Sequence, residues 1–167
     1  MTPELNSPTR PQRIMQLLAI ATGIFVLDQL SKYWLIYELN LPARAPLYIN
    51  DYFSLVMAWN KGVSFSMFAH SAEWMPAVLT AVAVAISALL AHLCLKSTLR
   101  IERIGYAMVI GGALGNACDR VRYGAVADFF YAHIGALGWP AFNVADMAIC
   151  TGVGLLLLAM LYPKKPA

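Results

Sequence analysis

The sequence has few charged residues. Only 13% of its 167 residues are Asp, Glu, Lys or Arg, whereas 60% are hydrophobic. Ordinary soluble domains carry roughly 25% charged residues. This shortage of charge argues against a soluble globular domain and indicates an integral membrane protein.

Cysteine and histidine are also scarce. The cysteines all lie in or at the end of apolar runs: Cys94, Cys118 and Cys150. This position favours small buried hydrophobic side chains over disulfides or metal ligands. The histidines show no mutual ligand spacing: His70, His92 and His133. We therefore predict no metal site and no cofactor.

Long apolar runs, in contrast, are abundant. Four candidate spans cover about residues 14–30, 75–95, 104–118 and 142–162. Each is close to the roughly 17 to 25 residues that cross a bilayer core of ~30 Å, although the first and third need their polar flanks to complete the span. The expected fold is an all-α integral membrane protein with four transmembrane helices, forming a single membrane domain.

The basic residues predict how these spans are oriented. Seven Lys and Arg residues fall on the side of the two termini and five on the other side, where the loops are about three times as long. This bias predicts cytoplasmic N- and C-termini, with residues 1–13 as a disordered tail. On this topology most Asp and Glu residues lie at the outer face.

The two outer segments differ in pattern. "DYFSLVMAW" (51–59) and "VSFSMF" (63–68) are typical of strands, and "NKG" between them is typical of a turn. We therefore expect a small antiparallel sheet over about residues 43–70, on the periplasmic side. Residues 119–141 are expected to form an amphipathic loop or helix at the interface, with Phe129 and Trp139 in contact with lipid.

Polar residues gather at the outer ends of the spans, where helix packing brings them to one depth. They form three groups: Asp28 with Lys32; Asn116, Asp119, Arg120 and Asp128; and Asn143 with Asp146. Asp28 and Lys32 have the i, i+4 spacing of a helical ion pair. An ionised side chain within a span costs about 2.5 to 3.5 kcal/mol at the bilayer centre, so these groups suggest a function.

Asp128 and Asp146 are the candidate catalytic pair. Two adjacent carboxylates do not readily both ionise, so one keeps a proton while the other acts as a base. Such a pair activates water and protonates a leaving amine, as peptide hydrolysis requires. A structural alternative stays open for each: Asp146 as a helix-start acid favoured by the macrodipole, and Asp128 as a solvated loop acid or helix cap.

Two other functions compete with a peptidase. In a small transporter or proton channel, intramembrane carboxylates bind ions, but here the acids gather at one face and the inner halves of the spans are almost without polar side chains. A scaffold subunit would use the small-residue face of Gly111 and Gly115 to pack against partners, which leaves the carboxylates unexplained.

Five sequence blocks carry a family resemblance. They are "FVLDQLSK" (25–32), "NKGVSF" (60–65), "GGALGNACDR" (111–120), "GAVADF" (124–129) and "FNVAD" (142–146). In order and spacing they resemble the motifs of bacterial lipoprotein signal peptidase, or signal peptidase II. The likeness covers about residues 14–162.

The resemblance implies an aspartic endopeptidase of the bacterial inner membrane, multi-pass, with its active site facing the periplasm. Its substrate would be a diacylglyceryl-modified prolipoprotein, cut on the N-terminal side of the lipidated Cys. We expect a monomer in contact with membrane lipid, a globomycin-type inhibitor, and no nucleic-acid partner.

The same resemblance assigns roles to residues. Asp128 and Asp146 match the catalytic dyad. The positions that match substrate-binding or supporting residues are Asn60, Gly62, Asn116, Arg120, Asn143, Asp28, Lys32 and Asp119. The sequence departs from the usual pattern at Ala117, Cys118 and Met147, which concerns packing and not the dyad. A further hypothesis is a clamp, in which the outer sheet with Trp59 and Phe65 closes against the loop with Phe129 and Trp139.

Overall fold

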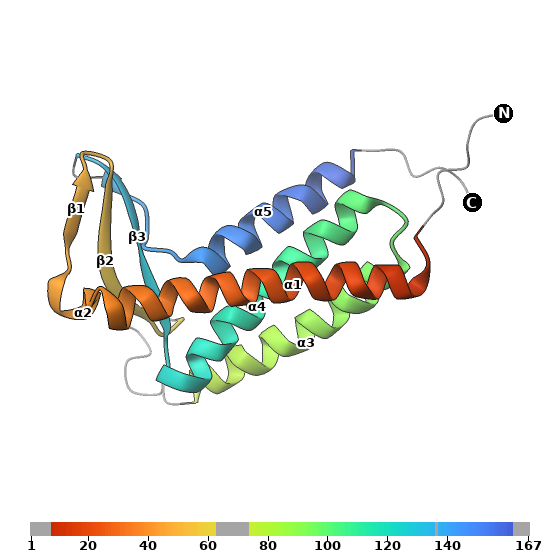
Figure 1. The fold of residues 1–167 in the computed structure, drawn as a ribbon, viewed down its shortest axis with the longest axis horizontal. Coiled ribbons are helices and arrows are strands. Elements are labelled where there is room, and N and C mark those ends of the chain that lie inside the picture. The colour runs from red at the N-terminus through yellow and green to blue at the C-terminus, as the bar shows by residue number, and fades with distance from the viewer. Residues whose placement is uncertain (1–7, 63–73, 136, 162–167) are drawn as a thin grey trace.

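The computed structural model describes residues 8–62, 74–135 and 137–161. Helices run along one direction and a small sheet lies at one end of them (Figure 1). The helices are α1 (Arg10–Tyr33), α2 (Leu41–Arg44), α3 (Met75–Lys96), α4 (Arg100–Tyr123) and α5 (Val144–Ala159), and α1 continues into a wider π-helical segment, η1 (Trp34–Glu38). The strands are β1 (Leu47–Asn50), β2 (Phe53–Asn60), β3 (Val126–Ile134) and β4 (Leu137–Gly138).

Helix α4 is the centre of the bundle, because α1, α3 and α5 all pack against it. Small residues allow the close approach. Gly112 faces the backbone of Ala145 on α5, and Gly105 faces Gly152 further along the same pair of helices. A Cβ atom at either glycine of α4 would overlap the α5 backbone, so Gly105 and Gly112 set the distance between these helices.

The apolar helices expose their side chains instead of burying them. Among the described residues, α1 with its extension and α3 are long and apolar enough to cross a membrane. In each of them, only 11% of the most apolar stretch of 18 residues is buried. Helix α5 is apolar but shorter. A helix that formed the core of a soluble protein would be mostly buried, so this exposure fits a membrane protein.

The expectation of a mostly helical protein with a small antiparallel sheet is confirmed. The sheet has the order β1-β2-β3-β4, and β2 pairs antiparallel with both β1 and β3. Strand β2 covers most of the predicted segment 51–59. The second predicted strand, 63–68, lies outside the described residues.

The prediction for residues 119–141 was wrong. Residues 119–123 continue α4, and Val126–Ile134 forms strand β3, where we expected an amphipathic loop or helix. The reason is non-local. The segment is rich in β-branched and aromatic residues, and it completes its backbone hydrogen bonds on β2, about seventy residues earlier in the chain.

Two other boundaries differ from expectation. Helix α1 begins at Arg10, so residues 10–13 are helical and not part of a disordered tail, and residues 1–7 lie outside the described part. Helix α4 ends because Gly124 adopts a left-handed conformation with φ +70°, and its N–H donates to the Arg120 carbonyl at 3.0 Å. The turn after Gly124 leads directly into β3.

The clamp hypothesis was also wrong in its geometry. Phe129 is fully buried beside Leu35 and Leu41, so it does not rest against lipid. Strand β3, which carries Phe129, pairs with β2, which carries Trp59. The two segments that were expected to close against each other are therefore neighbouring strands of one sheet. Trp139 is 70% exposed, as expected of an interfacial residue, and Phe65 lies outside the described residues.

The cysteines differ in burial. Cys94 is fully buried as expected, Cys118 is partly buried, and Cys150 is exposed on the apolar surface of α5. All are free thiols. The prediction of buried cysteines is therefore confirmed for Cys94 and wrong for Cys150.

Candidate functional site

The predicted site residues lie where the helix ends meet the sheet. Helix α5 begins there with Asn143 as its N-cap. The Asn143 side-chain oxygen accepts the Asp146 backbone N–H at 2.9 Å, and the Asp146 carboxylate accepts the Asn143 backbone N–H at 3.1 Å. This reciprocal capping box fixes the position of the Asp146 carboxylate at the first turn of the helix.

The Asn143 side chain also joins the two predicted catalytic acids. Its amide nitrogen donates to Asp128 at 2.7 Å and to the side-chain oxygen of Asn116 at 3.1 Å. Asn143 is therefore in contact with Asp128 on β3 through its nitrogen and with Asp146 on α5 through its oxygen. Asp128 and Asp146 are 18 positions apart in the sequence, and both contact the buried side-chain amide of Asn143.

Two further amides complete the bonding of the acids. Asn116 of α4 donates to Asp146 at 2.8 Å, and Asn60 at the end of β2 donates to Asp128 at 3.1 Å. The orientation of the Asn60 amide is set by Gly62, whose N–H donates to the Asn60 side-chain oxygen at 2.8 Å. Gly62 has φ +81°, a left-handed conformation that glycine adopts without strain.

A buried ion cluster lies behind the acids. The Lys32 ammonium is 2.8 Å from the Asp28 carboxylate and 2.7 Å from the Asp119 carboxylate, and it donates to Asn116 at 3.3 Å. The ion pair expected from the i, i+4 spacing is thus present, with Asp119 as a second acid. All three charged side chains are nearly inaccessible, so the cluster depends on mutual pairing.

The ion cluster holds the backbone immediately before each predicted catalytic acid. Asp119 accepts the N–H of Ala127, the residue before Asp128, at 3.2 Å. Asp28 accepts the N–H of Ala145, the residue before Asp146, at 3.0 Å. One lysine with two carboxylates therefore connects β3 and α5 at the positions that aim Asp128 and Asp146.

Burial and charge perturb the Asp128 carboxyl, which is 2% exposed. The pKa of Asp128 is raised to about 6; desolvation is the largest cause, and the nearby Asp146 charge acts in the same direction. The hydrogen bonds from Asn60 and Asn143 act in the opposite direction, because they stabilise the carboxylate. Asp128 therefore titrates near neutral pH, in the range that suits general acid or base chemistry.

The Arg120 guanidinium uses only part of its hydrogen-bonding capacity within the described chain. Its Nη1 donates to the Asn116 carbonyl at a long 3.4 Å, and its buried Nε has no hydrogen-bond partner within the described chain. The guanidinium is also in electrostatic contact with Asp146, Asp119 and Asp128. A buried N–H group without an acceptor is costly, so this side chain is suited to bind an incoming carbonyl oxygen.

Sequence reasoning missed one member of the network, Gln29. Its amide nitrogen donates to Asp28 at 3.1 Å and to Asp119 at 3.0 Å, and its oxygen accepts from Arg122 at 3.3 Å. The only sequence signal is its position beside Asp28. A neutral side chain next to an acid has no pattern of its own, and its contacts on α4 are about ninety residues away.

An aromatic contact at the edge of the site was also unforeseen. The Trp59 ring, next to Asn60, lies 5.3 Å from the Tyr123 ring at the end of α4. The Tyr123 hydroxyl lies 3.2 Å from the Tyr37 hydroxyl of η1. These rings connect the end of β2 with two helices, and so they support the position of Asn60.

Known proteins are similar to this chain in sequence. Residues 20–162 match the family model described as "Signal peptidase (SPase) II". A lipoprotein signal peptidase of Azoarcus sp. (strain BH72) is 40% identical, over 98% of this chain and 93% of the relative. Another, from Beijerinckia indica subsp. indica, is 44% identical over 80% of each chain.

Solved structures agree with the fold. A bacterial membrane enzyme determined by the in meso method at 2.3 Å resolution superposes with a TM-score of 0.75 at 22% identity, covering 92% of this chain and 95% of that one. A second such enzyme, at 1.9 Å resolution, gives a TM-score of 0.73 at 23% identity, covering 90% and 96%. The family match and the two similar relatives show that this chain belongs to the signal peptidase II family.

Proposed function

We propose that this membrane-embedded peptidase cleaves diacylglyceryl-modified prolipoproteins on the N-terminal side of the lipidated Cys, with Asp128 and Asp146 as an aspartic dyad. The family is one of lipoprotein signal peptidases, which supports a protease acting on the signal peptides of prolipoproteins. One observation carries the finer proposal: Asn143 donates to both carboxylates, to Asp128 through its side-chain amide and to Asp146 through its backbone N–H.

The proposed chemistry uses one proton between the two acids. The ionised carboxyl accepts a proton from a water molecule while the water oxygen attacks the scissile carbonyl carbon. The protonated carboxyl donates its proton to the carbonyl oxygen. When the tetrahedral intermediate collapses, the C–N bond breaks, the leaving nitrogen takes a proton from the protonated carboxyl, and a hydroxyl group of the intermediate gives its proton to the ionised carboxyl. The pair then again holds a single proton. The raised pKa of Asp128, about 6, favours this shared state near neutral pH.

Arg120 and Asn60 are the proposed substrate-binding groups. The unpartnered Nε of Arg120 supports a role in binding a substrate carbonyl beside the dyad. Asn60 donates to Asp128, its amide is held by Gly62, and the residue is exposed, so a bound peptide could reach it. Such preorganised donors stabilise the charge that develops on an attacked carbonyl oxygen.

Asn116, Asn143, Asp28, Lys32 and Asp119 are the proposed supporting residues. Their hydrogen bonds and ion pairs run from the helix ends to the acids and to the backbone beside them. A catalytic pair must keep its geometry within a fraction of an ångström, and buried neighbours with satisfied hydrogen bonds supply that rigidity.

We further propose a multi-pass protein of the bacterial inner membrane with both termini in the cytoplasm and the site facing the periplasm. The site lies at the ends of exposed apolar helices, beside the sheet (Figure 1). A lipid-anchored substrate has its scissile bond near the membrane interface. A site at this depth therefore meets the bond while the acyl chains stay in lipid.

The decisive experiment uses purified protein in detergent with a diacylglyceryl-modified prolipoprotein, followed by mass spectrometry of the products. The unsubstituted protein should release a fragment that begins at the lipidated Cys, and globomycin should block this release. Asp128→Asn and Asp146→Asn should each reduce cleavage by about a thousandfold or more while the protein stays folded.

The matched control is Asp51→Asn, because Asp51 is an exposed aspartate in the turn between β1 and β2. This variant should cleave at the unsubstituted rate. Comparable cleavage by the Asp128→Asn or Asp146→Asn protein would reject the dyad. A scaffold subunit would show no cleavage at all in the unsubstituted protein.

A further inference from the structure

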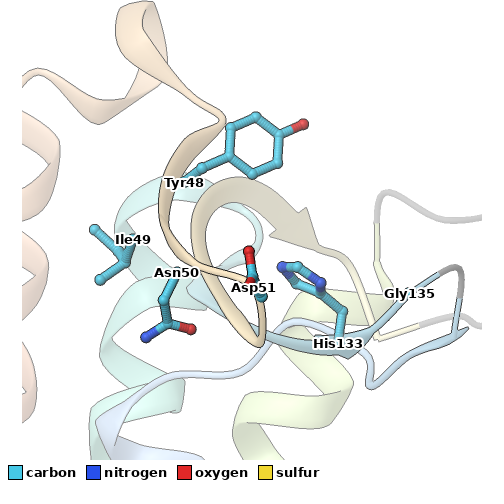
Figure 2. Close-up of a pocket in the computed structure, with 6 residues that line it drawn as sticks. All are labelled: Tyr48, Ile49, Asn50, Asp51, His133 and Gly135. Atoms are coloured by element: carbon cyan, nitrogen blue, oxygen red, sulfur yellow. The ribbon is translucent and has the colours of Figure 1, made fainter.

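A second polar site lies at the far end of the sheet. An open pocket of about 610 Å³ is lined by Tyr48, Ile49, Asn50, Asp51, His133 and Gly135 (Figure 2). The strand β2 begins near this pocket at Phe53 and ends at Asn60 beside the candidate active site. Eight residues of extended strand span roughly 25 Å, so the pocket is separate from the dyad.

The pocket offers one acid and several hydrogen-bond donors. The exposed Asp51 carboxylate has no hydrogen-bond or ion-pair partner within the described chain. The Asn50 side-chain oxygen accepts the Tyr52 N–H at 2.9 Å, and the amide N–H groups of Asn50 have no acceptor within the part of the chain that the structure describes. His133 is fixed by a 2.9 Å hydrogen bond between its Nε2 and Ser54 and by stacking on Tyr131 at 5.3 Å, and among the described residues its Nδ1 has no hydrogen-bond partner.

Exposed apolar and aromatic side chains surround these polar groups. They are Tyr48, Ile49, Tyr52, Ile134, Leu137 and Trp139, and each is more than half exposed. Tyrosine and tryptophan beside aliphatic residues are typical of surfaces that lie at the headgroup level of a membrane. No Lys or Arg lines the pocket.

The position of the pocket fits contact with lipid. The sheet crosses the ends of the apolar helices, and the end that carries the β1–β2 turn projects past the start of α5 (Figure 1). With the membrane placement proposed above, on which this inference rests, the projecting end would lie over lipid beside the apolar helices. A phospholipid headgroup is therefore the ligand nearest to the pocket.

We propose that this pocket binds the headgroup of a phospholipid that carries a primary ammonium group, of the phosphatidylethanolamine type. The ammonium donates to the Asp51 carboxylate, and the phosphate accepts from Asn50 and His133. The upper parts of the acyl chains contact Tyr48 and Ile49. A trimethylated headgroup has no N–H to donate, and an anionic headgroup without a cation is repelled by Asp51.

This binding site goes beyond the proposed peptidase activity and gives the sheet a fixed contact with the membrane. It is tested without a cleavage assay. The full-length protein in detergent is titrated with dioleoyl phosphatidylethanolamine, phosphatidylcholine or phosphatidylglycerol, and the bound lipids are counted by native mass spectrometry. We expect the ethanolamine lipid to bind about three- to fivefold more tightly than either of the others, as one accessible ion pair allows.

Asp51→Asn should abolish this preference, and the matched control Glu38→Gln should keep it. Glu38 is an exposed acid at the end of η1, outside the pocket. Equal binding of the three lipids by the unsubstituted protein would overturn the proposal. Retention of the preference in Asp51→Asn, or its loss in Glu38→Gln, would overturn it equally. An unchanged melting temperature of Asp51→Asn in the same detergent shows that this variant is folded.

Discussion

The two ends of the helix bundle both bury polar side chains, but they use them differently. At the end without the sheet, Arg103 is 5% exposed and donates to the carbonyls of Ser97 at 3.4 Å and Thr98 at 3.0 Å. Arg13 donates to the Leu95 carbonyl at 3.1 Å. These arginines satisfy the backbone carbonyls at and just after the end of α3, which have no partner inside the helix.

At the sheet end, polar side chains bond mainly to one another. Asn143, Asn116 and Asn60 come from three different elements, and each donates to one of the two predicted catalytic acids. There, the buried Nε of Arg120 has no hydrogen-bond partner among the residues that the structure describes. Buried polarity alone therefore does not identify a site. Convergence of side chains with spare bonding capacity does, because only such groups are available to a substrate.

Removing the buried cation should have the largest effect on stability. Lys32→Met leaves Asp28 and Asp119 as adjacent buried carboxylates without a counter-ion, which should lower the free energy of unfolding by about 3 to 5 kcal/mol. Thermal unfolding in detergent measures this change, with the exposed Lys61→Met as the control. Equal melting temperatures for the two variants would mean that the cluster is solvated.

The next prediction concerns the Asn143 side chain, which contacts both predicted catalytic residues. Asn143→Ala removes the α5 cap and the bond to Asp128 together. We expect cleavage to fall by about a hundredfold or more, and stability to fall by about 1 kcal/mol from the lost cap. Kinetics and unfolding of the same preparation separate the two effects. A large stability loss with normal kcat would assign Asn143 to folding alone.

The other end of the bundle should respond in the opposite manner. Arg103→Gln leaves the carbonyls after α3 with fewer donors and should lower stability by about 1 to 3 kcal/mol. The folded variant should retain its kcat/KM. Arg100→Gln, at an exposed position on the same helix, is the control and should change neither quantity. A reduced kcat in Arg103→Gln would show that the two ends are coupled.

The pH dependence reports on the Asp128 carboxyl. Because the dyad needs one proton, kcat/KM should fall about tenfold per pH unit once the pH exceeds the pKa of about 6. Asn60→Ala removes a donor that lowers this pKa, so the alkaline limb should move to higher pH. An unmoved limb would indicate that another group controls it.

The same pKa has a consequence for stability. The folded pKa of Asp128 lies above the ordinary value of 3.8, so the folded state holds this proton more tightly than the unfolded chain does. Its stabilising contribution is therefore present below about pH 4 and is lost as the pH rises through 6. Asp128→Asn should flatten this part of the stability curve.

The smallest expected effect concerns the rings beside Asn60. Tyr123→Phe removes only the hydroxyl contact with Tyr37 and should change kcat/KM by less than about twofold. Tyr123→Leu also removes the tilted ring contact with Trp59 and should lower kcat/KM by about two- to fivefold. Identical rates for both variants would exclude a positioning role for the ring.

Local pattern was sufficient for much of the fold. The long apolar runs predicted the helices α1, α3 and α5, since length and hydropathy depend on neighbouring residues only. The strand β2 was also predictable from its aromatic and β-branched residues. Strand β3 was not, because its segment becomes a strand by pairing with β2.

The site divides in the same way. The sequence determined which side chains are proposed to carry the chemistry: the acids Asp128 and Asp146 and the Asp28–Lys32 pair through residue type and spacing, and the amides around them through the family resemblance. The tertiary structure alone decided that Asn143 lies between the acids and that Asp119 holds the backbone before Asp128. Hydrogen bonds act over about 3 Å, so contacts between segments far apart in the chain exist only once the helices and the sheet have packed.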